Sequence, residues 1–264
     1  MPLSLLILVA AIQGLTEFLP VSSSGHLVLI PIVTDFAYQG RVIDVAAHVG
    51  TLVAVAIYLR IEIIAIAAAL IRSGRNDAVN ARLGIMLILA TIPVIIAGYI
   101  VNYANWHWLD MVYSLAFANL IFAVILWFSD KAPATRRDLG QIGLPHALII
   151  GIVQICALIP GASRSGVTMS AARFLGYDRV TAARFSLLLS LPTIAGAGLL
   201  KTLDLVKSGD ATLGADAIIV AVLSAGLAWL AIRWMMRWFA TAGFGIFVYY
   251  RLALGGLLLL ALAQ

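Results

Sequence analysis

The chain has 264 residues, of which 63% are hydrophobic and only 11% are charged, with a formal net charge of +5. Soluble domains carry about 25% charged residues, so this composition excludes a water-soluble protein with one core and predicts a polytopic membrane protein. The positive charge does not indicate a nucleic-acid partner, because the basic residues lie in short segments between apolar runs. A single cysteine, Cys156, excludes an internal disulfide and a cysteine-rich metal site.

Long apolar segments predict transmembrane helices, each of which requires about 20 apolar residues. Six segments meet that length, at residues 42–60, 81–101, 111–129, 179–201, 215–234 and 243–263. The chain is therefore expected to be a single all-α integral membrane domain over residues 1–264.

A further apolar segment, Leu3–Leu19, is interrupted by Gln13 and Glu17. It is broken at Pro20 and the serines that follow, and it resumes at His26–Val33. Irregular backbone at membrane depth requires surrounding protein or a water-filled cavity. The pattern predicts a re-entrant helix hairpin.

A second interrupted segment has the same form. Leu144–Ile159 is broken at Pro160 and Gly161 and resumes at about Val167–Leu175. This stretch predicts a second re-entrant hairpin.

Basic residues predict the orientation, because Lys and Arg concentrate in cytoplasmic loops. Loops 61–80, 130–143 and 233–242 are rich in Arg or Lys and are expected to be cytoplasmic. Segment 102–110 has no Lys or Arg and is expected outside, together with loop 202–214.

These sides divide the chain into two halves, at about 1–130 and 141–264. Each half is a hairpin followed by three spans, and the two halves have opposite orientation. This is an inverted-topology repeat, in which broken helices meet near the membrane midplane.

Both breaks carry related polar motifs, at Gln13–His26 and Gln154–Thr168. In each motif a Gln precedes a Gly by twelve residues, with a Pro and a Ser-x-Ser ahead of that Gly. The first copy adds Glu17 and His26, whereas the second adds Arg164. The two motifs are interpreted as halves of one polar site.

A helix that restarts after a break presents free N–H groups and a positive dipole end, which favour an anion. Arg164 adds a planar cation suited to phosphate, and inside a membrane it requires an anionic partner, either Glu17 or a phosphate. The residues expected to bind the substrate are Gln13, Ser22, Ser24, Gly25, Ser163, Ser165, Gly166 and Thr168.

Glu17 is a candidate general base or divalent-cation ligand. His26 is a candidate proton carrier or nucleophile, and Ser23 is the competing nucleophile. With Arg164 these catalytic candidates suit phosphoryl transfer, and the intramembrane position indicates a substrate with a lipid tail. In the simpler alternative the serines only cap helices and a Glu17–Arg164 pair only joins the hairpins; the two matched clusters favour function.

Other polar residues receive structural interpretations. Asp44 and His48, four residues apart, are expected to pair with each other or to line the cavity mouth. Glu62 is expected to be solvated. The arginines expected to set topology or bind lipid head groups are Arg173, Arg179 and Arg184.

At Gln13–His26 and Pro160–Thr168 the sequence resembles the bacterial undecaprenyl-diphosphate phosphatase family, also called bacitracin-resistance proteins, with weaker support from Phe185–Pro192. The resemblance covers essentially the whole chain. It implies an enzyme of the bacterial inner membrane that hydrolyses a C55 isoprenyl diphosphate to the monophosphate and phosphate, which recycles the lipid carrier of peptidoglycan synthesis and confers bacitracin resistance.

The resemblance also implies a site that opens toward the periplasm and works with Mg²⁺ or Ca²⁺. It assigns Glu17 to metal or acid–base work, Ser23 and His26 to catalysis, and Arg164 to diphosphate binding. The nucleophile stays open between His26 and Ser23. Many members have a second glutamate where this chain has Gln13, so a two-carboxylate metal site is not expected here.

The alternative function is a transporter or flippase for a phosphorylated lipid, because inverted repeats with broken helices are common among secondary transporters. A pure carrier would not need a nucleophile and a proton carrier. The expected partners are a polyprenyl diphosphate and membrane lipids, with a second copy of the chain as a candidate partner and no nucleic acid.

Overall fold

The structure is a computed structural model that describes residues 1–72, 77–104, 112–135, 138–207 and 214–262. Within these residues all regular secondary structure is helical. The first half of the chain forms α1 (Leu3–Thr16), α2 (Ser23–Val33), α3 (Arg41–Tyr58), α4 (Arg60–Arg72), α5 (Ala78–Ala104) and α6 (Val112–Lys131). The second half forms α7 (Leu144–Val153), α8 (Arg164–Phe174), α9 (Arg179–Lys207), α10 (Ala215–Thr241) and α11 (Gly245–Leu262), with 3-10 turns at Leu139–Gln141 and Gln154–Leu158.

Five described helices are long and apolar enough to cross a membrane, so the expectation of a multi-pass all-α membrane protein is confirmed. They are Arg41–Tyr58, Ala78–Ala104, Tyr113–Lys131, Arg179–Leu199 and Ala215–Thr241. The segment expected to be a sixth span forms α11, whose Gly245–Leu260 stretch falls among the shorter apolar helices.

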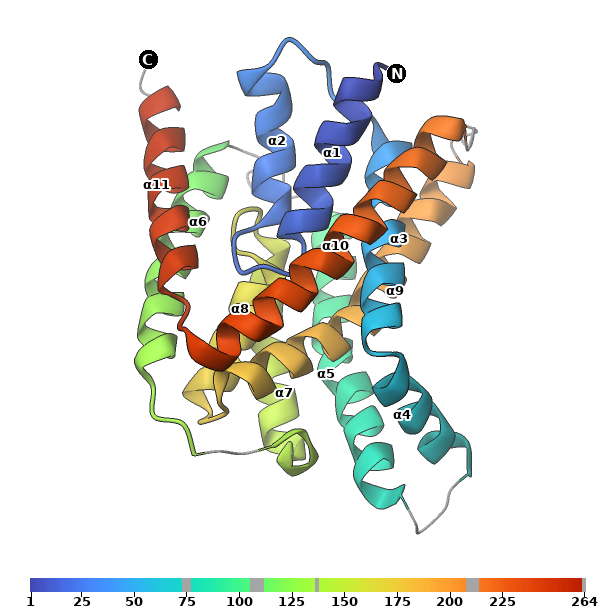
Figure 1. The fold of residues 1–264 in the computed structure, drawn as a ribbon, viewed down its shortest axis with the longest axis vertical. Coiled ribbons are helices and arrows are strands. Elements are labelled where there is room, and N and C mark those ends of the chain that lie inside the picture. Colours follow the sequence, from blue (N-terminus) through green and yellow to red (C-terminus); the bar gives the residue numbers. More distant parts are fainter. Residues whose placement is uncertain (73–76, 105–111, 136–137, 208–213, 263–264) are drawn as a thin grey trace.

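Both interrupted segments form pairs of short helices. In Figure 1, α1 and α2 enter from the end of the molecule where both termini lie, and α7 enters from the opposite end. The two breaks meet inside the molecule, where the Ser165 hydroxyl donates to the Leu19 carbonyl oxygen at 2.8 Å. This contact brings together the two polar motifs, which lie more than a hundred residues apart in the sequence.

The long helices pack in corresponding pairs. α1 and α3 of the first half both pack on α10. In the same way, α7 and α9 of the second half both pack on α5. α6 and α11 pack on each other. Glycines permit two of these contacts: a Cβ at Gly14 of α1 would lie 2.8 Å from the Ser224 carbonyl oxygen of α10. A Cβ at Gly151 of α7 would lie 2.3 Å from the Ala90 carbonyl oxygen of α5. The first arm of each hairpin is therefore held tightly against a long helix.

Loop 61–80 was expected to be irregular, but most of it forms α4, which begins directly after α3. Ile66 and Leu70 of α4 pack against α5 at Gly84, where an added Cβ would lie 2.7 Å from the Ile66 side chain. Ile66 and Leu70 lie four residues apart on one face of α4, which allows this packing although the helix is too short to span a membrane.

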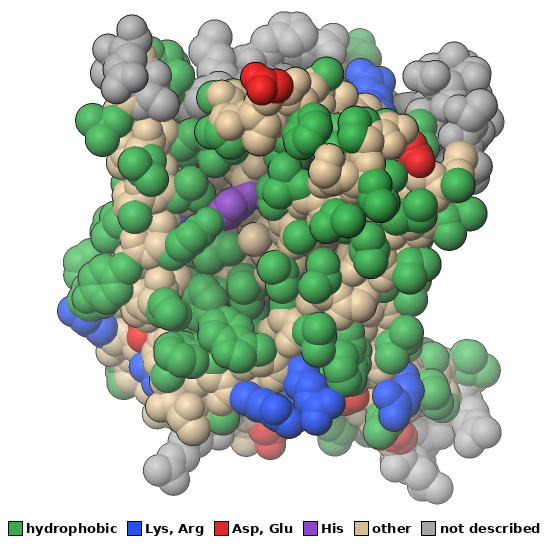
Figure 2. Space-filling model, turned by 45° about the horizontal axis from the view of Figure 1, so that its top comes forward, with side chains coloured by type: hydrophobic (Ala, Val, Ile, Leu, Met, Phe, Trp, Pro, Cys, Tyr) green, Lys and Arg blue, Asp and Glu red, His purple; other side chains and the backbone are tan. Residues whose placement is uncertain are grey.

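Described basic residues gather at the end of the molecule opposite the termini, below a broad hydrophobic face (Figure 2). Arg60, Arg233 and Arg237 line one surface pocket there with Tyr58 and Trp229. α1 begins and α11 ends at the opposite end of the molecule from these basic residues (Figure 1). Residues 73–76, 105–111, 136–137 and 208–213 of the predicted loops lie outside the described residues.

Three arginines near the α8–α9 turn form hydrogen bonds or ion pairs within the protein, and their expected role in topology or in binding lipid head groups stays a prediction. Arg173 is 4% exposed and donates to the carbonyl oxygens of Tyr177, Asp130 and Ala132. Arg179 forms an ion pair with Asp130. The third, Arg184, forms an ion pair with Glu62 of α4, so Glu62 is paired and not simply solvated.

Candidate functional site

Both hairpins restart after a serine with an unusual backbone conformation. Ser22 has φ 73° and Ser163 has φ 69°, and these are the only described residues other than glycine with positive φ. Such φ values are uncommon for residues with a Cβ and cluster at functional sites. α2 begins at Ser23 and α8 at Arg164. Each helix starts about three residues earlier than predicted, which places both Ser-x-Ser segments in the first turn of a helix.

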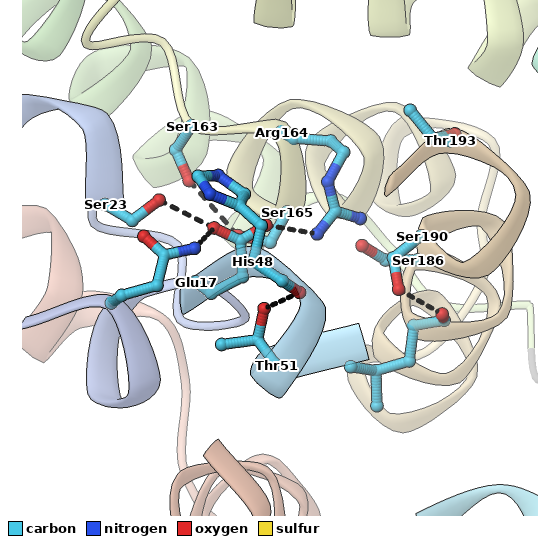
Figure 3. A network of polar contacts seen from close by, with 12 residues as sticks. Glu17, Ser23, His48, Thr51, Ser163, Arg164, Ser165, Ser186, Ser190 and Thr193 are labelled. Atoms are coloured by element: carbon cyan, nitrogen blue, oxygen red, sulfur yellow. Dashed lines mark hydrogen bonds and ion pairs between the residues drawn. The ribbon is translucent and has the colours of Figure 1, made fainter. Parts of the chain in front are cut away.

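The Glu17 carboxylate is the centre of the polar network (Figure 3). Its Oε2 accepts from the Ser23 hydroxyl at 2.7 Å and from the Gln13 side-chain nitrogen at 2.9 Å. Its Oε1 accepts from Arg164 at 3.1 Å, which confirms the predicted partner of that arginine. The Glu17 side chain is 8% exposed, so these donors supply the stabilisation that a buried carboxylate requires.

Arg164 offers a second edge that the protein leaves open. Its side chain is 12% exposed, and its buried Nη1 atom has no hydrogen-bond partner among the described residues. In Figure 3 the guanidinium lies between the Glu17 carboxylate and the hydroxyls of Ser186, Ser190 and Thr193 on α9. A buried donor without a partner is costly, so this edge is suited to an anion in the adjacent space.

That space is a cavity lined by Glu17, Val45, His48, Arg164 and four α9 residues, which are Thr193, Ile194, Ala197 and Gly198. It combines a carboxylate, a guanidinium, an imidazole and a hydroxyl with apolar walls. Such a lining can bind a phosphate head group beside an alkyl chain.

His26 lies away from this cavity lining. Its Nδ1 contacts the Ser22 carbonyl oxygen at 2.7 Å, and its Nε2 contacts the Tyr250 hydroxyl at 2.5 Å. The His26 ring also stacks on the Tyr250 ring, with centroids 5.5 Å apart. Both ring nitrogens are therefore engaged between α2 and α11, and the structure does not place His26 beside Glu17 and Arg164.

The predicted binding residues of the first motif hold its break together. Ser22 is buried, and its hydroxyl lies 3.3 Å from the Ser24 hydroxyl. Gly25 is buried in the same turn, where an added Cβ would lie 3.5 Å from the Ser22 hydroxyl oxygen. These three residues do not line the cavity, and neither does Ser23, which is joined to the cavity wall by its hydrogen bond to Glu17.

The predicted binding residues of the second motif are similarly occupied. The Ser163 hydroxyl accepts from the Gly166 N–H at 3.2 Å and caps α8, and it lies 3.1 Å from the Ser165 hydroxyl. The Thr168 hydroxyl donates to the Arg164 carbonyl oxygen at 2.9 Å and contacts the Ser186 hydroxyl at 2.7 Å. The capping interpretation is thus correct for Ser163, and Arg164 is the residue of this motif that reaches the cavity.

Gln13 and Gln154 occupy corresponding positions and are both 0% exposed. The side-chain oxygen of each lacks a partner among the described residues. The Gln13 oxygen is therefore a free oxygen ligand next to Glu17, whereas both Glu17 oxygens already accept from nitrogen or hydroxyl donors. The described residues contain no group of three or more His, Cys, Asp and Glu that could hold a metal ion. Gln13 thus fits a divalent cation only if most of the ion's ligands come from a substrate.

Arg251 of α11 was not predicted as a site residue, although it is 0% exposed. Its guanidinium donates to the carbonyl oxygens of Pro20 at 3.3 Å, Gly161 at 2.8 Å and Ala162 at 3.0 Å, so it joins both breaks. Its importance could have been predicted from the sequence, because a lone arginine inside an apolar segment such as 243–263 usually has a functional role.

His48 and three hydroxyl residues of α9 also contribute to the site, although the sequence motifs do not include them. The interpretation that His48 lines the cavity is confirmed. Its pairing with Asp44 involves the backbone, because His48 Nδ1 lies 2.8 Å from the Asp44 carbonyl oxygen while the Asp44 carboxylate accepts from Tyr38 and Gln39. The α9 hydroxyls, Ser186, Ser190 and Thr193, follow helical spacing along one face, a pattern visible in the sequence.

Comparison with known proteins identifies the family. A sequence model of the family described as bacitracin resistance protein BacA matches residues 6–257. The chain belongs to this family. Among curated BacA relatives, the undecaprenyl-diphosphatase of Dinoroseobacter shibae is 46% identical over 259 residues, which covers 97% of each chain. Those of Ruegeria pomeroyi and Alteromonas mediterranea are 45% and 41% identical, each covering 96% of both chains. The resemblance found from the two motifs is confirmed.

Proposed function

We propose that the protein hydrolyses undecaprenyl diphosphate to undecaprenyl phosphate and inorganic phosphate. The observation that carries this proposal is the identity of 41–46% to undecaprenyl-diphosphatases over nearly the whole chain. The product is the lipid carrier that peptidoglycan synthesis reuses, and this recycling accounts for the bacitracin resistance in the family description.

The terminal phosphate is proposed to bind at the open edge of Arg164. The support is its buried Nη1 atom without a partner and its place in the cavity wall. The first turns of α2 and α8 add helix dipoles of the sign that stabilises an anion. Apolar side chains of the lining, such as Val45 and Ile194, would accommodate the first part of the isoprenyl chain.

Ser23 is the proposed nucleophile, and Glu17 is the proposed base. The support is the 2.7 Å hydrogen bond from the Ser23 hydroxyl to Glu17, together with the engagement of both His26 nitrogens elsewhere. As the Ser23 oxygen bonds to the terminal phosphorus, its proton passes to Glu17 and the bridging P–O bond breaks. Undecaprenyl phosphate leaves, and a phosphoserine remains. Water then attacks this phosphorus, and the serine oxygen recovers its proton from Glu17.

Mg²⁺ or Ca²⁺ is proposed to arrive with the diphosphate, with the Gln13 side-chain oxygen as its protein ligand. The support is that this oxygen is buried and lacks a partner within the described part of the chain. When bound, the cation would neutralise charge on the phosphate oxygens.

In the membrane, we propose six spans and two re-entrant hairpins arranged as an inverted repeat of residues 1–130 and 141–264. The support is the correspondence of the helix pairs and of the two restarts at Ser22 and Ser163. The membrane is proposed to be the bacterial inner membrane, with the basic end in the cytoplasm. The cavity would then open toward the periplasm, since its lining comes from the first half of α3 and the second half of α9, and α3 begins and α9 ends toward the end of the molecule where α1 begins.

The test is phosphate release from a C55 isoprenyl diphosphate by the purified protein in detergent, beside Glu17→Gln. We expect release by the wild type and a fall of about 10²- to 10⁴-fold in the variant, because an amide cannot accept the serine proton. Arg164→Ala should also lower activity at limiting substrate. Substrate binding by the wild type without any phosphate release would contradict the proposal and would favour a lipid carrier.

A further inference from the structure

Two described histidines, His26 and His48, lie in the first half of the chain. Of these two, His48 lines the cavity, whereas His26 contacts Tyr250. His48 lies in the second turn of α3, outside both motifs, and its side chain is half-buried. In Figure 3 its ring extends from α3 to the side of the Glu17 carboxylate. An imidazole is therefore present where the proposed reaction would occur.

The hydrogen bonding of His48 determines which ring nitrogen is available. Nδ1 lies 2.8 Å from the Asp44 carbonyl oxygen, and a carbonyl oxygen can only accept, so Nδ1 carries the proton. In the neutral ring Nε2 is then an acceptor. No described residue forms a hydrogen bond to Nε2, so it is free to contact a water molecule in the cavity.

The charged surroundings of His48 are mixed. Glu17 from α1 and Arg164 from α8 face the same cavity and neutralise each other through their ion pair. The α9 side of the cavity, which consists of Thr193, Ile194, Ala197 and Gly198, carries no charge. On its own helix, Asp44 directs its carboxylate to Tyr38 and Gln39. His48 therefore shares the cavity with one carboxylate and one guanidinium, which are paired with each other.

We propose that His48 is a further catalytic residue of this site, the general base for the second half of the reaction. This inference rests on the proposed phosphatase function. When water attacks the phosphoserine, His48 Nε2 takes one water proton, the new P–O bond forms, and the bond from phosphorus to the Ser23 oxygen breaks. That oxygen recovers its proton from Glu17, phosphate leaves, and the imidazolium returns its proton to water. Glu17 is then the general base for Ser23, and His48 is the general base for the water.

The chain offers a matched pair of variants, His48→Gln and His26→Gln. Glutamine keeps hydrogen-bonding capacity but cannot carry the proton. With undecaprenyl diphosphate in detergent, we expect His48→Gln to lower kcat about 100-fold or more while KM changes less than about threefold. His26→Gln should lower kcat less than about tenfold, because His26 would only position α2 against α11.

One further readout separates a proton carrier from a packing residue. Added imidazole should raise the rate of His48→Ala, which leaves space beside the cavity, but not the rate of His26→Ala.

Two results would overturn the inference. They are a His48→Gln enzyme with more than about a third of wild-type kcat, and a His48→Ala enzyme that does not respond to imidazole. The proposed function itself is judged separately, because its failure would appear as an absence of phosphate release by the wild type.

Discussion

Ser23 and Arg164 occupy the same position in the two breaks, and both donate a hydrogen bond to Glu17. Each is the first residue of a helix that follows a serine with positive φ. The bonds are 2.7 Å from the Ser23 hydroxyl and 3.1 Å from the guanidinium. The position that corresponds to Glu17 in the second motif is Leu158. Matched backbones thus supply the geometry, whereas the residues that differ between the motifs are the proposed nucleophile, base and anion-binding cation.

This arrangement predicts that neighbouring serines differ sharply in importance. Ser23→Ala should abolish phosphate release, to below about 10⁻³ of wild type, because it removes the proposed nucleophile. Ser24→Ala should keep most activity, since Ser24 is exposed and, among the described residues, its hydroxyl contacts the Ser22 hydroxyl alone. The measurement is steady-state kcat on undecaprenyl diphosphate. Similar activity of the two variants would rule out Ser23 as the nucleophile.

Much of the fold follows from the sequence, because hydrophobic length and Pro/Gly breaks determine it locally. The segments expected to span the membrane all form helices, and the two interrupted segments form pairs of short helices that meet. Two details were not predictable. α4 depends on packing against Gly84 of α5, a tertiary contact. The restarts at Ser23 and Arg164 depend on positive φ at the preceding serines, which residue identity alone does not indicate.

The site was predicted less completely, because a sequence motif shows which residues are neighbours along the chain but not which way each side chain points. Glu17, Ser23 and Arg164 do meet, as expected. His26 is four residues after Ser22 on a helix that also faces α11, so its ring turns to Tyr250. His48 comes from a different helix, and only the packing of α3 beside α1 brings it to the cavity.

The two glutamines allow a test of the proposed cation site. Gln13→Leu should raise the Mg²⁺ concentration that gives half-maximal activity by about tenfold, because the substitution removes the proposed protein ligand and so weakens metal affinity. Gln154→Leu is the matched control, because this residue is equally buried but bonds toward Thr193. EDTA should lower wild-type activity, and added Mg²⁺ or Ca²⁺ should restore it. Equal shifts in both variants, or no effect of EDTA, would exclude Gln13 as a metal ligand.

Arg251 predicts a large effect on stability. Arg251→Met leaves the carbonyl oxygens of Pro20, Gly161 and Ala162 without this donor, and the expected loss in unfolding free energy is about 3 kcal/mol. This corresponds to a decrease in Tm of about 6–12 °C in detergent, followed by circular dichroism. Arg237→Met is the control and should change stability by less than about 0.5 kcal/mol, because Arg237 is exposed. An unchanged Tm for Arg251→Met would show that the bonds to the two breaks add no net stability.

The contact between α3 and α10 predicts that one glycine is essential and another is dispensable. A Cβ at Gly50 would lie 2.1 Å from the Ala221 carbonyl oxygen, so Gly50→Ala must push the two helices apart. Such overpacking typically destabilises by about 1–3 kcal/mol, and the movement would also shift His48, which lies on the same helix. Gly226→Ala in α10 is the control, since an added Cβ there meets nothing within 4 Å. We expect Gly50→Ala to lower both Tm and kcat, and Gly226→Ala to leave both unchanged or to raise Tm slightly. If the two variants had equal Tm values, the close packing of α3 on α10 would be wrong.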